Sequence, residues 1–225
     1  ADAFGCGFLI DSSFKFLHLN TILFRRSAET LRRSAHWALR FRKRCGYGIH
    51  SPFAFGFVTG VVYERGEYYA YSRLPQPASG RRRTLRRKDL RLLFRIMNFQ
   101  RPAVCLLVGT RHGSAEALWL NAGSCHTHLI EEGETWHSVF DMVYAVGDWP
   151  SRVPSLLPRL AQGGMVVVHD ICSTREKREA WRRMLDMPQC VVSFDLRDFG
   201  IVMYRPELQR EHYRVLTLQF GPIHH

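Results

Sequence analysis

The sequence lacks any apolar run long enough to cross a bilayer, so a chain anchored by a membrane-spanning helix is not expected. The apolar stretch at residues 8–10 is too short and too poorly flanked for a secretory signal. None of the six cysteines forms a CxxC pair, which argues against the common zinc and dithiol motifs and indicates reduced, structural thiols. We therefore expect a soluble, cytoplasmic protein.

Acidic residues are also scarce, with 20 Asp and Glu against 32 Lys and Arg, and the net charge is +12. Such an excess favours nucleic acid, an acidic surface or an anionic substrate as a partner. The basic residues are concentrated at residues 25–44 and 81–91. The positive charge therefore belongs mainly to two segments and less to the domain as a whole. The hydrophobic content of 46% is sufficient for the domain to form a core.

Three regions are expected along the chain: an N-terminal extension at 1–46, a helical linker region at 47–102 and an α/β domain at 103–220. In the extension, apolar residues recur among arginines at 27–44, which predicts a basic amphipathic helix. This helix either packs on the domain, which is the interpretation we favour, or presents a surface to a membrane, RNA or protein partner.

The linker region carries a helix signal and a loop signal. Ser51 is suited to the N-cap and Pro52 to the first position of a helix. Residues 72–87 are rich in Pro, Gly and Arg, which predicts an exposed connection. This connection is either a solvated linker, which is the interpretation we favour, or a lid over the turn that follows. A helix at 88–99 is expected to follow.

The most informative stretch is the strand, turn and helix at residues 103–120. The apolar run at 103–108 predicts a strand buried on both faces, and Gly109 opens a turn into a helix that begins near Ser114. Glycine at the end of a strand lets a ligand approach the backbone, and the helix N-terminus offers free N–H groups. This arrangement is the usual cofactor crevice of an open α/β sheet, although Leu107 stands where such turns commonly carry an acidic residue.

From residue 103 onward, strands and helices alternate, which predicts an α/β fold with a mostly parallel sheet. Only residues 196–200 separate the last two strands, which predicts a closing antiparallel hairpin. Strands are expected at 104–108, 126–130, 142–146, 165–169, 190–195 and 201–204, and helices at 114–121, 151–160 and 175–187.

Three stretches follow one another along the chain: GIHSPF at 48–53, the glycine turn at 108–114, and VVVHDI at 166–171 with FGIVMYRP at 199–206. Together they resemble class I S-adenosylmethionine (SAM)-dependent methyltransferases, especially a group of small methyltransferase-like proteins from Bacteroidetes bacteria. The resemblance spans about residues 47–215. It implies a Rossmann-like, doubly wound sheet of seven strands, with SAM as the cofactor.

The resemblance also assigns cofactor contacts. It implies that Gly109, Thr110 and Gly113 face the methionine part of SAM. Glu131 matches the family's acidic residue after the second strand, which binds the ribose hydroxyls, and a carboxylate suits that bidentate task.

At the acceptor end, the resemblance points to the end of the fifth family strand. His169 and Asp170 occupy the place where the family tends to have paired carboxylates. Asp170 is a candidate for contact with the substrate or a metal, and His169 is a candidate base for removing a proton from the methyl acceptor. The acceptor is a small molecule or another group of unspecified class.

The chain departs from the family in two places. Only residues 131–141 separate the second predicted strand from the next, which is too few for the helix, strand and helix that the family inserts. The third strand, whose following loop holds the adenine in the family, is therefore expected to be absent. In the fourth motif, Val146 replaces a carboxylate that can serve as metal ligand or base, and Asp148 lies two positions later.

Other histidines and cysteines carry weaker signals. His50 and His112 are further candidate bases, and each suits an ordinary turn equally well. The run at 125–128, CHTH, contains metal-ligand types, but no second element completes a tetrahedral set, so no metal site is expected.

Two hypotheses of different classes follow from these residues. The first is a SAM-dependent methyltransferase that uses the residues named above. The second is a non-catalytic scaffold with the same fold, which has lost the adenine side of the pocket and binds a protein or anionic partner through its arginines.

Overall fold

The computed structural model describes residues 49–75, 85–134 and 139–215. The chain separates into two units, 1–42 and 43–225, and every described residue belongs to the second unit. The amphipathic helix predicted at 27–44 lies outside the described residues. The elements are α2 (Pro52–Phe57), the π-helical turn η2 (Val58–Val62), the 3-10 turn η3 (Tyr69–Ser72), α3 (Arg87–Gln100), β1 (Val104–Val108), α4 (Ala115–Gly123), β2 (His128–Glu131), β3 (Phe140–Ala145), α5 (Trp149–Leu156), the 3-10 turn η4 (Leu157–Arg159), β4 (Leu160–His169), α6 (Arg175–Leu185), β5 (Val192–Asp195), β6 (Phe199–Met203) and β7 (Glu211–Arg214).

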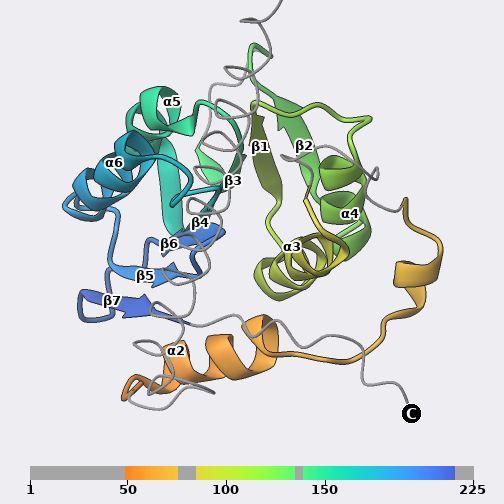
Figure 1. Cartoon of the computed structure of the whole chain (residues 1–225), viewed down its shortest axis with the longest axis horizontal. Coiled ribbons are helices and arrows are strands. Elements are labelled where there is room, and N and C mark those ends of the chain that lie inside the picture. Colours follow the sequence, from red (N-terminus) through yellow and green to blue (C-terminus); the bar gives the residue numbers. More distant parts are fainter. Residues whose placement is uncertain (1–48, 76–84, 135–138, 216–225) are drawn as a thin grey trace, which may run out of the picture. The chain divides into compact units, whose positions relative to one another are not determined.

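One seven-stranded sheet organises these elements, in the order β2-β1-β3-β4-β6-β5-β7 (Figure 1). Strands β1, β2, β3 and β4 are parallel. Strand β6 is antiparallel to both β4 and β5, and β7 is parallel to β5. The predicted fold class is therefore confirmed: an α/β, Rossmann-like, mostly parallel sheet with an antiparallel hairpin in its C-terminal part.

The central strands are buried on both faces, because helices cover each side of the sheet (Figure 1). Leu107 and Tyr144 belong to the apolar cluster that contains α3 and α4. The next residues along the same strands, Val108 and Ala145, belong to the cluster that contains α5 and α6. This alternation explains why the strands read as continuous apolar runs in the sequence.

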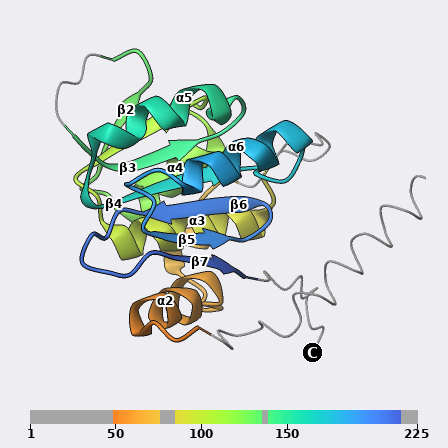
Figure 2. The ribbon, with the colours of Figure 1, turned by 90° about the vertical axis from the view of Figure 1, so that its left-hand side faces the viewer.

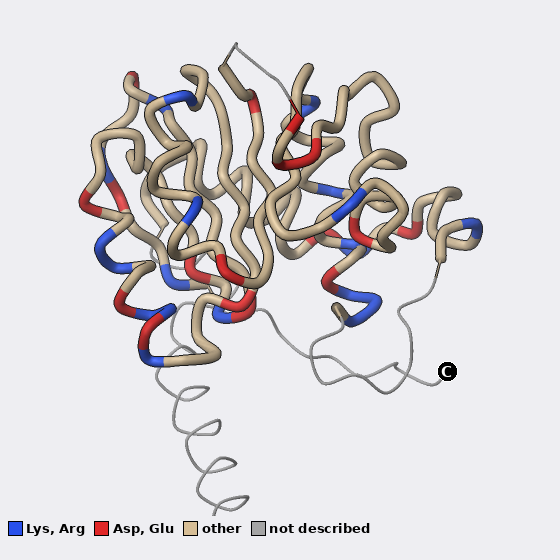
Figure 3. Tube along the Cα trace, turned by 90° about the horizontal axis from the view of Figure 1, so that it is seen from above, with Lys and Arg blue, Asp and Glu red and all other residues tan. Residues whose placement is uncertain are grey.

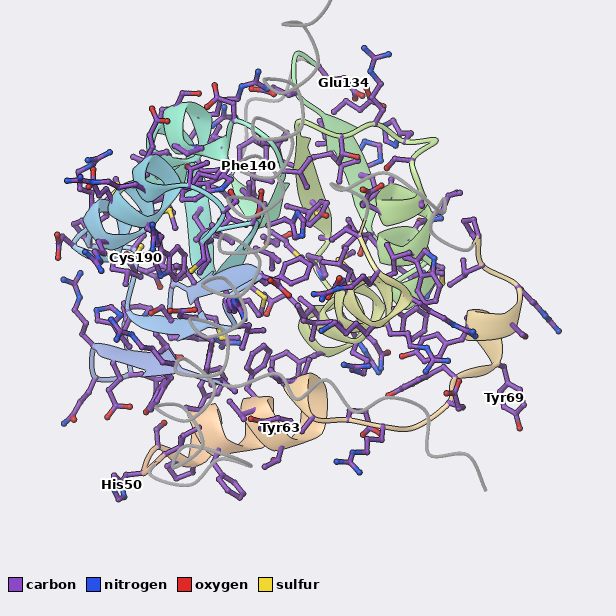
Figure 4. The ribbon with its side chains drawn as sticks, in the orientation of Figure 1. His50, Tyr63, Tyr69, Glu134, Phe140 and Cys190 are labelled. Atoms are coloured by element: carbon purple, nitrogen blue, oxygen red, sulfur yellow. The ribbon has the colours of Figure 1, made fainter. Side chains whose placement is uncertain are left out.

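Helix α2 extends the first of these clusters toward the β5 and β7 side of the sheet (Figure 2). The ring of Phe57 lies 4.8 Å from that of Phe194 on β5 and 5.3 Å from that of Phe99 on α3. Arg95 of α3 donates from Nε to the carbonyl of Val61 at 2.7 Å, which satisfies an end of the π-helical turn. Tyr69, in the next turn, points away from the ribbon and is 97% exposed (Figure 4).

The starts of α2 and α4 follow the capping residues that the sequence predicts, whereas the helix predicted at 151–160 begins earlier, at Trp149, and gives way to η4 at Leu157 and to β4 at Leu160. Ser51 caps α2, with Pro52 at its first position, and Ser114 caps α4 by accepting a hydrogen bond from Ala117 N at 3.1 Å. Thr174 caps α6 by accepting from Lys177 N at 3.2 Å. Within the described part of the chain, no helix combines the length and apolarity that crossing a membrane requires.

The sheet differs from the prediction at the β7 edge. The hairpin β5–β6 does not close the sheet, because β7 pairs with β5 beyond it. Glu211 N donates to Val191 O and Val215 N to Asp195 O, both at 2.9 Å. The strand has only four residues and two of them are exposed, so its sequence pattern is too weak to predict it.

At the opposite edge, β2 is the last strand of the sheet. Among residues 132–134 and 139, which are the described part of the connection, no strand lies between β2 and β3. This agrees with the expected loss of the third family strand. Strand β4 begins at Leu160 rather than at residue 165, because Leu160 pairs with Phe140 and the glycines that follow hide the strand signal.

A close approach between α3 and α4 gives the first prediction. A Cβ atom on Gly123 would lie 2.4 Å from the carbonyl oxygen of Phe94, whereas a Cβ on Gly56 would have no atom within 4 Å. We expect Gly123→Ala to lower the free energy of unfolding by about 1 to 3 kcal/mol through overpacking. Gly56→Ala, a matched change in α2, should leave it unchanged or raise it by up to about 1 kcal/mol. Urea unfolding of both variants would show this, and equal effects would contradict it.

Candidate functional site

Strands β1, β3 and β4 end at one edge of the sheet, which we call the carboxyl edge. The carboxyl ends of parallel strands are where open α/β sheets bind ligands. Gly109 follows β1, Val146 follows β3, and His169 ends β4. Glu131 ends β2 and is the register partner of Leu107 on β1. The predicted cofactor and acceptor residues are therefore brought to the same edge.

The turn after β1 is fixed by backbone geometry. Gly109 has φ +74°, a left-handed conformation that glycine adopts without strain, and a Cβ on it would lie 2.5 Å from the carbonyl oxygen of Val146. Gly113 has no atom within 4 Å of the place that a Cβ would take. Thr110 Oγ1 donates to Ser114 Oγ at 2.8 Å, which ties the turn to the cap of α4. Gly109 is thus required by the approach of β1 to β3, and space is open beside Gly113.

Glu131 points toward this turn. Its Oε1 accepts a hydrogen bond from His112 N at 2.7 Å, and its side chain remains 30% exposed. The backbone N–H of Glu131 donates to Glu134 Oε1 at 3.1 Å, and Glu134 lies beside the end of β2 (Figure 4). His112 Nε2 lies 3.5 Å from Glu134 Oε1 and 3.9 Å from Glu131 Oε1. The carboxylate of Glu131 is therefore held in place and keeps contact with solvent.

Asp170 has a strained backbone at the end of β4. Its φ is +70°, which is unusual for a residue other than glycine, and its N–H donates to Asp198 O at 2.5 Å. Its Oδ2 lies 3.3 Å from Lys177 Nζ of α6, whose side chain is only 18% exposed. The charge of this carboxylate is therefore balanced by a lysine from within the protein.

The first turn of α3 reaches the same edge from the other face. Arg86 donates from Nε to Asp89 Oδ2 at 2.9 Å and from Nη2 to a carboxylate oxygen of Asp198. Asp89 is buried and also accepts from Arg86 N at 2.9 Å. Two ion pairs, Lys177 with Asp170 and Arg86 with Asp198, are therefore joined across the carboxyl edge by the backbone hydrogen bond from Asp170 N to Asp198 O. Along the described part of the chain, basic and acidic residues alternate in short stretches (Figure 3).

His169 lies within this charged surrounding. Its ring centroid is 4.9 Å from that of Phe199, its register partner on β6. Burial lowers the pKa of His169 from its ordinary value of 6.5, against an opposing effect of the nearby carboxylates, Asp170 above all. The imidazole is therefore neutral at pH 7 and able to accept a proton.

Several weaker candidates are placed elsewhere or serve the fold. Residues 124–127 form a turn before β2 rather than a strand, and Thr127 Oγ1 donates to Pro102 O at 2.6 Å. Asp148 accepts from Ser151 Oγ at 2.7 Å in the first turn of α5. His50 directly precedes the Ser51 cap and lies at the start of α2 (Figure 4). In the described part of the chain, no group of three or more His, Cys, Asp or Glu residues is arranged to hold a metal ion.

Some polar residues of this edge lack a functional signal in the sequence. Asp89 accepts the backbone N–H of Arg86 in the first turn of α3, so its carboxylate serves the start of the helix. Asp198 lies in the hairpin turn between β5 and β6, and Tyr144 lies in an apolar strand. Only the pairing of strands brings these residues together.

No protein-family model matches the sequence, and no curated protein matches it either. Among solved structures, the chain is similar to the O-methyltransferase TomG of Streptomyces achromogenes, crystallised with SAM, at 15% identity and a TM-score of 0.42, covering 62% of this chain and 91% of that one. It is also similar to the Podospora anserina methyltransferase PaMTH1, bound to SAH, at 12% identity and a TM-score of 0.44, covering 79% and 96%. An O-methyltransferase of Bacillus cereus in complex with SAH gives 12% identity and a TM-score of 0.41, covering 74% and 96%. Likenesses this low assign no activity to the chain.

The lowered pKa of His169 makes stability depend on pH. Between the folded pKa and the unfolded value of 6.5, the unfolded chain binds more protons, so the free energy of unfolding falls as the pH drops through this window. When the pH is lowered from about 7.5 to about 5, we expect the free energy of unfolding to fall less in His169→Gln than in the unchanged protein. Urea unfolding at several pH values would measure this, and parallel pH profiles of the two proteins would contradict it.

Proposed function

We propose that the protein is a SAM-dependent methyltransferase whose cofactor lies across the turn after β1. The observation that carries this proposal is the placement of Glu131, whose carboxylate is held by His112 N at 2.7 Å beside the Gly109 turn and stays partly exposed. A fixed, solvent-facing carboxylate at the end of the neighbouring strand is suited to binding two ribose hydroxyls.

The residues at the turn are compatible with the methionine part of the cofactor. Thr110 and the first turn of α4 present hydroxyl and N–H donors, and a helix N-terminus favours a carboxylate. The open space beside Gly113 allows a ligand to approach the backbone. We assign Gly109 a different task, because its φ and its distance to Val146 require glycine even without a ligand.

We place the methyl acceptor over the end of β4 and the start of β6, where His169 pairs with Phe199. SAM, when bound, supplies a methyl group on a sulfonium centre. His169, neutral at pH 7, is the base that we expect to receive the acceptor's proton, and its partly buried ring is held against Phe199. Asp170 and Lys177 orient the acceptor through a charge pair fixed at 3.3 Å. The acceptor is therefore expected to be a protic nucleophile, such as a hydroxyl or an acid.

A divalent metal does not suit the donors at the acceptor end. Val146 supplies no ligand where the resembling family has a carboxylate, and the carboxylate of Asp170 is already paired with Lys177. The ammonium of Lys177 is a positive charge at the place where a metal would provide one. We therefore propose that proton removal relies on His169 alone.

The alternative of a non-catalytic scaffold rests on the arginine-rich segments. Residues 25–44 and most of 81–87 lie outside the described residues. Of the three described arginines in the second segment, Arg87 is exposed, Arg86 is paired with Asp89 and Asp198, and Arg91 donates to Glu67 at 2.8 Å. Because the side chains of Arg86 and Arg91 are engaged within the protein, these two arginines favour the enzyme over a polyanion binder.

The test is calorimetric titration of the full chain with SAM and with SAH. We expect micromolar binding, weakened by about 1 to 3 kcal/mol in Glu131→Ala, because a hydrogen bond to a charged group is lost. Glu131→Gln keeps an acceptor for His112 N and should bind between the two, which separates the lost charge from a disturbed turn.

Glu132→Ala serves as the control for this titration. Glu132 is the next residue along the chain, and its carboxylate pairs with Arg152 of α5 at 2.6 Å. Binding by this variant should match that of the unchanged protein. If the unchanged protein shows no binding heat and no thermal stabilisation at about 1 mM ligand, the methyltransferase is ruled out and the scaffold is favoured.

A further inference from the structure

The imidazole of His112 stands beside two carboxylates at the end of β2 and has no task in the reaction proposed above. Its Nε2 lies 3.5 Å from Glu134 Oε1 and 3.9 Å from Glu131 Oε1. The side chain of His112 is 49% exposed and that of Glu134 is 51% exposed. Histidine is the side chain whose charge ordinarily changes between pH 5 and 8. This ring is therefore open to protons from solvent while it faces two groups that attract its charged form.

The main chain and the side chain of His112 approach the same oxygen of Glu131. The backbone N–H donates to Oε1 at 2.7 Å, and Nε2 of the ring lies 3.9 Å from this atom. The backbone hydrogen bond does not depend on pH, because an amide N–H does not titrate in this range. A ribose hydroxyl that bonds to Oε1 must therefore share it with a ring whose charge does depend on pH.

Among the described residues, neither Glu131 nor Glu134 has an ion pair other than the one with His112. Glu132, between them along the chain, is engaged elsewhere, with its Oε2 2.6 Å from Arg152 Nη1. Arg111 directly precedes the ring in the chain and forms no ion pair in the described part of the protein. Protonation of His112 is therefore the change of charge that these two carboxylates meet as the pH falls below neutrality.

We infer that His112 is a pH-dependent switch of cofactor binding. In its protonated form it pairs with Glu131 and Glu134 and competes with the ribose for the carboxylate of Glu131, whereas the neutral ring leaves this carboxylate to the ligand. Ion pairs between exposed groups are weak, so the switch lowers the affinity without abolishing it. The inference rests on the proposed function, to which the ribose contact of Glu131 belongs.

The direction of the pH dependence follows from the linkage between proton and ligand. In the free protein the two carboxylates stabilise the charged ring of His112, and a bound ribose takes up part of this interaction. Binding of the ligand therefore releases a proton, and by reciprocity protons weaken the binding of the ligand. The affinity for the cofactor should fall as the pH is lowered from about 8 to about 5.5.

The experiment is calorimetric titration of the full chain with SAH at these two pH values. We expect the affinity of the unchanged protein to be about threefold to fivefold lower at the lower pH. His112→Gln has no charge to gain, so it should bind at both pH values as tightly as the unchanged protein does at about pH 8. His112→Lys is charged at both pH values and should bind weakly at both. Both variants keep the backbone N–H that holds Glu131.

A matched control is His126→Gln. His126 is exposed in the turn that precedes β2, so it lies at the other end of this strand from Glu131. This variant should keep the pH dependence of the unchanged protein. Titration at about pH 6.5 in buffers with different ionisation enthalpies measures the released proton directly. The release should be found in the unchanged protein and in His126→Gln, and it should be absent in His112→Gln.

The same loss of affinity at low pH in His112→Gln and in the unchanged protein would overturn the inference and leave the proposed function standing. Affinity that rises at low pH, or tight binding by His112→Lys, would also overturn it, because a cation at this position would then not compete with the ribose. If the unchanged protein binds no SAH at either pH, the proposed function fails and the switch fails with it.

Discussion

The burial of β1, β3 and β4 on both faces is the constraint on which the rest of the structure depends. Three adjacent parallel strands with apolar side chains on both faces require helices above and below the sheet. Because each connecting helix returns to the start of the next strand, the first turns of α3 and α4 and the ends of the strands all meet at one edge. Polar side chains that the core cannot accept are thereby gathered at the carboxyl edge.

The same packing explains why the edge is charged but ordered. Asp170 keeps a left-handed backbone because Asp198 O accepts its N–H and Lys177 holds its carboxylate. Asp198 in turn bonds Arg86, so α6, the hairpin and α3 share one series of contacts. This series of contacts surrounds the end of β4, where His169 lies.

The two ends of the sheet have opposite characters. Strand β7 lengthens the sheet beyond the hairpin, and α2 packs beside that side through Phe57 and Phe194. At the other end, β2 is an edge strand, and a ligand extending past Glu131 meets no further strand in the described residues. The methionine and ribose contacts that we propose therefore lie on well-packed elements, whereas the adenine would rest on a more open surface.

Local signals in the sequence determined the helices, the central strands and the Gly109 turn, because capping residues, apolar runs and glycines act through near neighbours in the chain. They also placed Glu131, His169 and Asp170 at strand ends. Only the tertiary structure decided the β7 edge, the pairing of Leu107 with Tyr144 and the contacts of Asp198. These depend on strand register and on residues far apart in the sequence, for which the chain carries no local pattern. The arrangement of polar side chains at the carboxyl edge is therefore a property of the assembled sheet.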